Sequence, residues 1–286
     1  MKISLTAKAA ALVAISLASF SASAAVISSR DFNALTIGNL GTDVTGVTPG
    51  QDGWLTFGGT NASYQIVNDP VAGGTRGRNL RVTGPSSTST ATRFAWNDDV
   101  ANGWNVVTDQ EIVIIWDQYV AAPTTLQTNA TNRGGIRLFD TTGARTLVGM
   151  QIQANTGALS IISYFDPADG TNPVGNYFFN LGPGGAELPV ARNTWHTFAM
   201  TWNKVTGRSE LFWSIDGVPG FEAGVFVDGA SAGSNPIEYD ALITRNAATQ
   251  GTNFHFDNIS AETFIPEPAA MSLLALPAMA MLRRRK

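Results

Sequence analysis

The stretch that decides the fold runs from Trp195 to Gly217 and reads WHTFAMTWNKVTGRSELFWSIDG. Every second residue from His196 to Trp202 is large, and the residues between them are mostly small or polar, so a strand would send the large ones to one face. Residues 203–207, NKVTG, are typical of a turn. Leu211, Trp213 and Ile215 then repeat the period of two. The segment therefore predicts a β-hairpin with one buried face.

The rest of the body of the chain supports the same architecture. Its apolar residues come in short runs bounded by Gly, Asn, Asp, Ser and Thr, and no stretch keeps a period of 3.6 residues. Ten strands are predicted besides weaker ones, at 79–83, 111–120, 135–140, 146–153, 159–165, 177–181, 195–202, 210–216, 241–245 and 253–260. This pattern predicts an all-β protein, an antiparallel β-sandwich formed by one domain over residues 26–262.

Composition excludes several functions. The 286 residues include no Cys and two His, so disulfides, Cys-ligated zinc and thiol catalysis are excluded and a transition-metal site has few ligands. Residues 26–265 carry 12 basic and 21 acidic side chains, a net charge of −9. An acidic body of this kind has no basic patch for nucleic acid, and we expect none to bind.

The hairpin also resembles a segment of a known group of sandwiches. In concanavalin A-like and laminin-G-like domains a Trp-His pair opens a strand and an "IDG" turn closes the hairpin, as Trp195-His196 and residues 215–217 would here. The resemblance covers about 25 residues. It implies a jelly-roll form of the β-sandwich.

The N-terminus predicts export. Lys2 and Lys8 provide a positive start, residues 9–20 are apolar, and small residues follow at Ala22, Ala24 and Ala25. This is the pattern of a secretory signal peptide, which signal peptidase would remove after Ala24 or Ala25. We therefore expect residues 1–25 to be absent from the mature protein.

The C-terminus predicts transient contact with the inner membrane. Pro266-Glu267-Pro268 is followed by fourteen uncharged residues, 269–282, and then by Arg283, Arg284, Arg285 and Lys286. A helix of that length would span about 21 Å, less than the roughly 30 Å of a hydrocarbon core. The four cations would keep the end of this short transmembrane segment on the cytoplasmic side.

This tail resembles the PEP-CTERM sorting signal of Gram-negative bacteria. The triplet, the short apolar segment and the closing Arg cluster carry the resemblance, which covers residues 266–286, and the sorting signal as a whole is predicted over residues 263–286. In that family an exosortase recognises and removes the tail. The resemblance implies an exosortase as a partner and delivery to the cell surface or the extracellular matrix.

No catalytic pattern stands out in the sequence. Laminarinases of the concanavalin A-like group carry Glu-x-Asp-x-x-Glu on one strand, and this chain has no such motif. The two pairs of acids two residues apart, Asp109 with Glu111 and Glu238 with Asp240, are expected at strand ends in solvent. The prediction is therefore a non-enzymatic protein that binds carbohydrate or associates with exopolysaccharide. The alternatives are a structural, adhesin-like surface protein and a glycoside hydrolase.

The sequence predicts two kinds of binding residue. Secreted sandwiches often hold one Ca²⁺ with carboxylates and backbone carbonyls, and resemblance to related sandwiches favours Asp257 near the last strand together with Asp31 near the first. The loop 166–170 offers further acids, which could equally well only stabilise a turn. Trp54, Trp96 and Trp104 lie in Gly- and Asn-rich stretches and are expected to form an exposed platform for a polysaccharide ligand.

Overall fold

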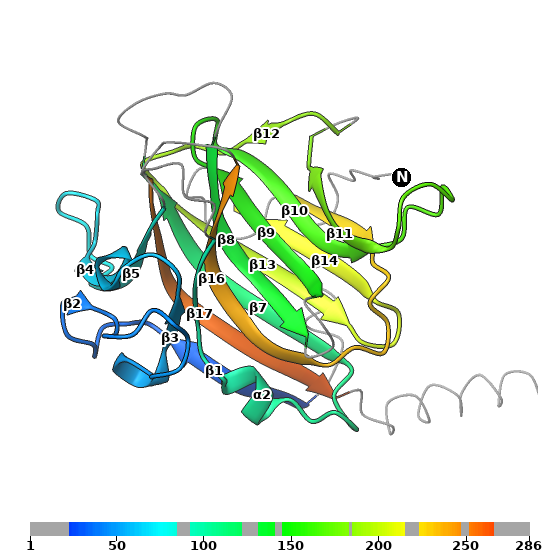
Figure 1. Ribbon diagram of the computed structural model, residues 1–286, viewed down its shortest axis with the longest axis horizontal. Coiled ribbons are helices and arrows are strands. Elements are labelled where there is room, and N and C mark those ends of the chain that lie inside the picture. The colour runs from blue at the N-terminus through cyan, green and yellow to red at the C-terminus, as the bar shows by residue number, and fades with distance from the viewer. Residues whose placement is uncertain are drawn as a thin grey trace, which may run out of the picture.

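The computed structural model describes residues 23–84, 92–121, 131–140, 145–182, 185–214, 223–246 and 252–265. Two antiparallel sheets are stacked face to face. Figure 1 shows β8 (Thr131–Asp140), β9 (Thr146–Gln153) and β10 (Ala158–Phe165) of sheet B in front of β7 (Glu111–Val120) and β13 (Trp195–Asn203) of sheet A. The prediction of an antiparallel β-sandwich is confirmed. Among the described residues there is no helix with the length and hydrophobicity needed to cross a membrane.

Sheet A has the order β15-β14-β13-β7-β17-β5-β4-β2, with β1 paired to β17. Its strands are β1 (Ser23–Arg30), β2 (Gly38–Asn39), β4 (Tyr64–Asn68), β5 (Arg78–Thr83), β7 (Glu111–Val120), β13 (Trp195–Asn203), β14 (Arg208–Trp213), β15 (Ala223–Asp228) and β17 (Asn253–Ile265). Two 3₁₀ helices, η1 (Gln51–Gly53) and η2 (Asn61–Ser63), lie between its early strands.

Sheet B has the order β11-β10-β9-β8-β16-β6-β3, with β12 paired to β10. Its strands are β3 (Leu55–Phe57), β6 (Arg93–Trp96), β8 (Thr131–Asp140), β9 (Thr146–Gln153), β10 (Ala158–Phe165), β11 (Gly175–Asn180), β12 (Leu188–Pro189) and β16 (Pro236–Asn246). One short helix, α2 (Asp99–Gly103), follows β6.

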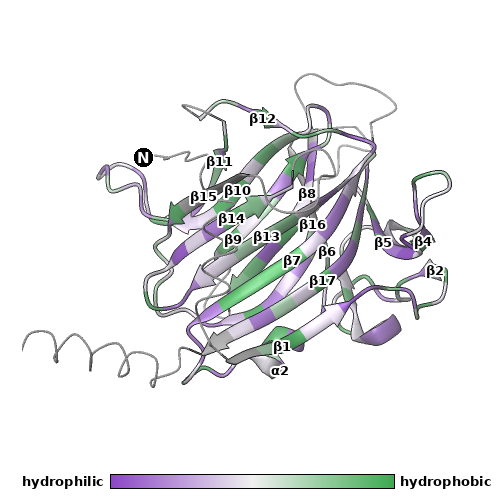
Figure 2. Cartoon of the chain, turned by 180° about the vertical axis from the view of Figure 1, so that it is seen from behind, coloured by the Kyte–Doolittle hydropathy of each residue, from purple (hydrophilic) through white to green (hydrophobic). Residues whose placement is uncertain are grey.

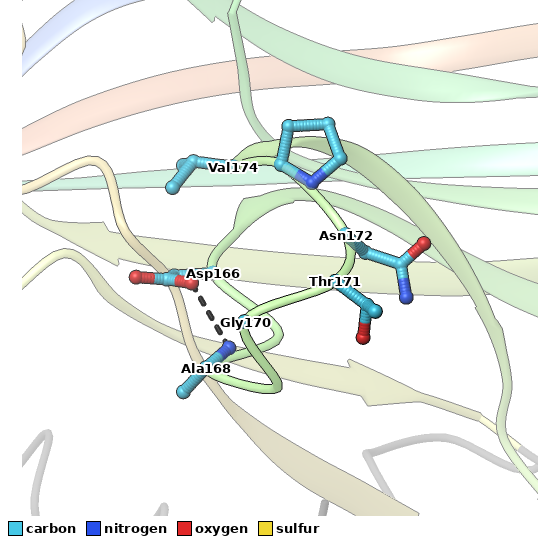
Figure 3. A pocket seen from close by; sticks show the side chains of 7 residues that line it. Asp166, Ala168, Gly170, Thr171, Asn172 and Val174 are labelled. Carbon is cyan, nitrogen blue, oxygen red and sulfur yellow. Dashed lines mark hydrogen bonds between the residues drawn. The ribbon is translucent and has the colours of Figure 1, made fainter.

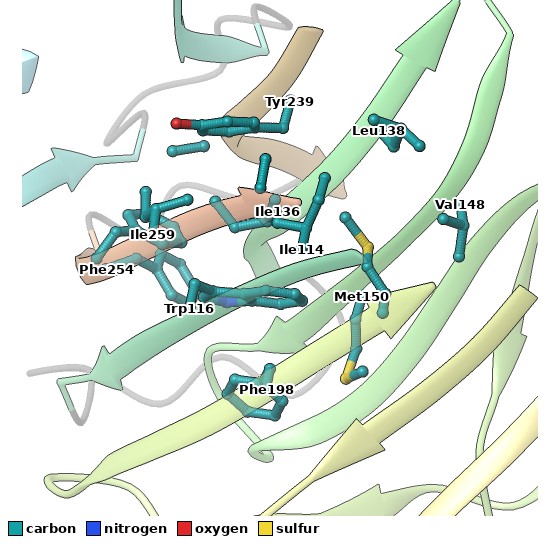
Figure 4. Packing of buried hydrophobic residues seen from close by; sticks show 14 of the residues in the cluster. Ile114, Trp116, Ile136, Leu138, Val148, Met150, Phe198, Tyr239, Phe254 and Ile259 are labelled. Atoms are coloured by element: carbon teal, nitrogen blue, oxygen red, sulfur yellow. The ribbon is translucent and has the colours of Figure 1, made fainter. Parts of the chain in front are cut away.

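The core lies between the two sheets. Trp116 and Phe198 of sheet A stack with ring centroids 5.5 Å apart, and Figure 4 shows them facing Ile136 and Met150 of sheet B. All four side chains are at most 1% exposed. Because alternate residues of each strand point inward, the opposite set of side chains covers the two outer faces. Figure 2 shows the resulting mixture of hydrophilic and hydrophobic residues along the strands.

The described residues contain a strand at each of the ten predicted places, and the largest errors concern the strand ends. The end of the strand predicted at 210–216 and the turn predicted at 215–217 lie outside the described residues. β16 begins at Pro236, five residues before the predicted start at Ala241. β17 continues to Ile265, past the predicted domain end at residue 262. β17 is longer because β1 pairs with its last residues, from Ile259 to Ile265, a long-range contact that local sequence cannot reveal.

The start of β1 and the end of β17 lie next to each other in sheet A. Ser23 pairs with Ile265 and Ala25 with Thr263, so the first described residue and the last lie side by side. Strand β1 thus begins before both predicted cleavage positions. Ala22, the sorting triplet and the closing cations lie outside the described residues.

Candidate functional site

The outer face of sheet B carries a continuous row of residues from six strands. Strand register places them side by side across the sheet, from Phe178 through Ile162, Gly149, Arg137 and Asp240 to Trp96. A Cβ on Gly149 would lie 2.6 Å from Cβ of Arg137. The glycine therefore lets the arginine lie close against the neighbouring strand.

Arg137 and Asp240 form a buried ion pair at the centre of this row. Arg137 Nε donates to both carboxylate oxygens of Asp240, at 2.8 and 3.0 Å, and its second guanidinium nitrogen donates at 2.8 Å. The side chain of Asp240 is 1% exposed and that of Arg137 15%. Burial raises the pKa of Asp240, whereas the charge of Arg137 acts to lower it. Asp240 is thus covered by its partner.

Glu238 lies on the same face of β16, two residues before Asp240. Burial raises the pKa of Glu238 to about 7, repulsion from Asp240 adds to the rise, and Arg137 opposes it. Among the described residues, none donates a hydrogen bond to its carboxyl. A carboxyl group that is partly protonated near neutral pH can deliver and accept protons, as a general acid or base must.

The placement of these two acids corrects the sequence analysis. They were expected in solvent at a strand end, but both lie inside β16, and Tyr239 between them is fully buried in the core. The sequence Glu238-Tyr239-Asp240-Ala241 does alternate acidic and apolar residues, and this period of two indicates a strand that contains both acids. The other pair does not form such a site, because Asp109 is 3% exposed and accepts a backbone bond from Asn105.

Arginines lie over aromatic rings along the same face. The guanidinium carbon of Arg137 is 4.8 Å from the ring centre of Phe94 and 4.5 Å from that of Phe139. Two further pairs lie on this face, Arg133 over Phe178 at 5.5 Å and Arg145 over Tyr164 at 4.8 Å. Cations over aromatic rings are stabilised by the ring quadrupole.

Of the three predicted platform tryptophans, Trp96 alone lies on this face. It is half-buried, pairs with Asp240 across the strands and packs near Gly46. Trp54 is 1% exposed and Trp104 6%, so the prediction that they face solvent is wrong. Trp54 packs against Phe32, with ring centroids 5.5 Å apart, inside the core.

The predicted calcium residues lie on sheet A. Asp257 is 1% exposed and is register-paired with Asp117, and burial raises its pKa to about 7, with repulsion from Asp117 and Asp31 contributing. Asp117 is already engaged by Arg76, Thr197 and Asn258. In the part of the chain that the structure describes, no group of three or more His, Asp or Glu is placed to hold a metal ion.

Calcium binding by Asp257 and Asp31 therefore stays a prediction. If it occurs, millimolar calcium will raise the melting temperature, because the ion binds the native state. The rise should be larger at pH 8 than at pH 6, since Asp257, whose pKa is about 7, must release its proton to bind. The measurement is differential scanning calorimetry, with Asp257→Asn as the control that should lose the effect.

The loop 166–174 forms a shallow pocket at the end of β10 (Figure 3). Asp166 Oδ1 accepts a bond from the backbone nitrogen of Ala168 at 2.9 Å, and Asp169 Oδ1 accepts from Thr171 and Asn172 at 2.9 and 2.8 Å. These are Asx turns, so the acids stabilise the loop itself. The two carboxylates therefore have the role that the turn interpretation predicts, because both accept hydrogen bonds from the backbone of their own loop.

Comparison with known proteins gives likenesses of fold. No protein-family model and no curated protein matches the chain. Among solved structures, the chain is similar to the alginate lyase vAL-1 from Chlorella virus, with 11% identity over 84% of this chain and 100% of the lyase, at a TM-score of 0.48. It is also similar to the carbohydrate esterase vb_24B_21 from Shiga toxin-encoding bacteriophage phi24B, with 16% identity, 80% and 99% coverage and a TM-score of 0.43. A third likeness is the CBM2 module of the evolved Dit of Lactobacillus casei BL23 phage J-1, with 12% identity, 85% and 96% coverage and a TM-score of 0.41.

These findings correct the expectation that the chain is not an enzyme. The similar structures include alginate lyases and a carbohydrate esterase, so the sandwich fold does not argue against catalysis. At such low identity the similar structures show the fold alone, and any chemistry of this chain depends on its own side chains.

Proposed function

We propose that this chain is an exported, carbohydrate-active protein that binds a polysaccharide across the outer face of sheet B and cleaves it with Glu238 as the proton-transferring residue. The observation that carries the proposal is the half-buried Glu238, whose pKa is raised to about 7 beside the Arg137–Asp240 pair. Aromatic rings flank it, as sugar-binding surfaces require for contact with the apolar faces of sugar rings.

The geometry divides the roles of the two acids. In hydrolysis, water adds to the anomeric carbon as the bond to the leaving oxygen breaks; the leaving oxygen takes the proton of a carboxyl with a raised pKa, and the proton that the water releases passes to solvent. Glu238 fits that role. Asp240 is 1% exposed and covered by Arg137, so it does not reach a sugar and instead fixes the position of the arginine. Glu238 and Asp240 thus resemble two carboxylates whose surroundings give them different tasks.

The test is depolymerisation of a panel of neutral and acidic polysaccharides by the full chain, followed by the release of new chain ends. Cleavage of at least one polymer is the expected result. If no polymer is shortened and none is bound, the proposal is wrong.

We also propose that the protein reaches the cell surface or the matrix through its two terminal signals. Support comes from the sequence patterns and from the pairing of Ser23 with Ile265, which places the first and the last described residues side by side. The triplet Pro266-Glu267-Pro268 follows the last strand directly. An enzyme acting there would not have to unfold the body.

Processing predicts the masses of the surface protein. In a host that has the exosortase, mass spectrometry should find neither residues 1–24 nor Arg283 to Lys286. Replacing the four cations with Ser removes the orientation signal, so the tail should stay unprocessed or be translocated. Intact Lys286 on surface-exposed wild-type protein would contradict exosortase processing.

A further inference from the structure

We infer that the polysaccharide bound on the outer face of sheet B is anionic and lies along strand β8. The inference rests on the proposed function, because it names the substrate class of the same site. It is carried by three arginines of this face, Arg133, Arg137 and Arg145, each of which lies over an aromatic ring.

The three arginines follow the direction of one strand. Arg133 and Arg137 are both on the outer side of β8, four residues apart, which corresponds to about 13 Å. Arg145 lies beyond the strand's end, because its carbonyl oxygen accepts a bond from the nitrogen of Asp140 at 3.1 Å. Positive groups at intervals along a line suit a polymer with repeated negative groups better than a single small anion.

The charge of this face differs from that of the rest of the chain. The body is acidic, yet three guanidinium groups gather on this face, near four carboxyls: Asp240, Glu238, Glu187, whose charge acts on Arg133, and Asp98, whose charge acts on Glu238. Of these carboxyls, Asp240 is bound to Arg137, and the pKa of Glu238 is about 7, so it is partly neutral at physiological pH. The three guanidinium groups therefore bring this face close to neutrality in an acidic protein, so that it repels an anionic ligand less than the rest of the acidic surface does.

Arg133 and Arg145 are the arginines positioned to bind an acidic group, since Arg137 already donates to Asp240 and Thr146. When a guanidinium lies flat on an aromatic ring, its N–H groups point outward in the plane of the guanidinium. In that direction they can form paired hydrogen bonds to a carboxylate or sulfate. The rings are partly exposed, 46% for Phe178, so they remain able to contact the sugar rings themselves. Glu238 pairs with Phe139 across the strands, beside the middle of this line of arginines. A bond cleaved at Glu238 would then be internal to the bound polymer.

The experiment compares polymers that differ only in charge. Binding of the full chain is measured by affinity electrophoresis and titration calorimetry against a polyuronate, the same polyuronate with its carboxyls reduced to alcohols, dextran and dextran sulfate. We expect affinity for at least one anionic polymer to exceed that for its neutral counterpart by about tenfold or more, and to fall with added salt. A preference for polyuronate identifies a carboxylate ligand, and a preference for dextran sulfate identifies a sulfate ligand.

Variants then locate the contact. Arg133→Gln and Arg145→Gln should each lower affinity for the anionic polymer about three- to tenfold, because each removes one charge-assisted contact. Arg208→Gln is the matched control, since Arg208 is 48% exposed on sheet A and should leave affinity unchanged. Equal binding of charged and neutral polymers would overturn the inference while leaving the proposed function intact. Absence of binding and cleavage with every polymer would overturn both.

Discussion

Glu238→Gln should lower the turnover number on the cleaved polysaccharide by about 10²- to 10⁴-fold and leave KM nearly unchanged. The amide keeps the shape of the side chain but cannot donate an acidic proton, and general acid catalysis contributes about that factor. Glu210→Gln is the matched control, because Glu210 is also half-buried with a raised pKa but lies on the outer face of sheet A. It should retain wild-type activity.

The pH dependence gives a second measure of the same residue. Because the pKa of Glu238 is about 7, the protonated form is lost as pH rises through that value. If Glu238 is the acid, the turnover number should fall above pH 7, and the basic limb of the profile should disappear in Glu238→Gln. A profile unchanged by the substitution would show that another group transfers the proton.

Glu238→Gln should raise the folding stability at alkaline pH although it lowers the activity. The pKa of Glu238 has its ordinary value of 4.5 in the unfolded state and is about 7 in the folded state, so between these two pH values the folded state binds more protons. Folding stability therefore falls as pH rises from about 4.5 to 7, and the full penalty remains above 7. Glu238→Gln removes the penalty, and we expect its melting temperature to exceed that of the wild type at pH 8 but not at pH 4. Lost activity with a raised melting temperature cannot be ascribed to unfolding.

The fold could be predicted from the sequence because it depends on local alternation. The hairpin from Trp195 onward and the strand at 146–153 show a period of two or a bounded apolar run, and both form as expected. The start of β16 was missed because Pro236 and two acids interrupt the apolar pattern. Pairing of Asp240 with Arg137, 103 residues away in the chain, makes an acid acceptable there. No local pattern contains that information.

The candidate site could be predicted only in part for the same reason. Trp96 was selected by its neighbours in sequence and does lie on the outer face of sheet B. Trp54 and Trp104 have similar neighbours but are buried, because Phe32 and Trp202 pack against them from distant segments. Glu238 acquires its raised pKa from burial and from Asp240, both of which depend on how the sheet assembles.

The Arg137–Asp240 pair should contribute the largest stability effect of any single residue on this face. Arg137→Met removes three hydrogen bonds to Asp240 and one to Thr146, and it leaves a carboxylate that is 1% exposed without its partner. Loss of one member of a buried pair costs about 3–5 kcal/mol in the free energy of unfolding. Chemical denaturation at pH 7 measures this loss. Arg208→Met, which breaks an exposed pair with Asp228 at 3.8 Å, is the control and should change stability by less than about 1 kcal/mol.

A double variant separates the charge from the packing. In Arg137→Met/Asp240→Leu no buried carboxylate remains, so the protein should recover much of the stability that Arg137→Met loses. The single variant should also be less destabilised at pH 5 than at pH 8. Asp240 is buried and without Arg137 would take up a proton more readily, which removes the uncompensated charge. If the double variant is as unstable as the single one, the pair acts through shape rather than charge. The methionine of Arg137→Met would then be overpacking the space between Phe94 and Phe139, where the guanidinium now lies flat.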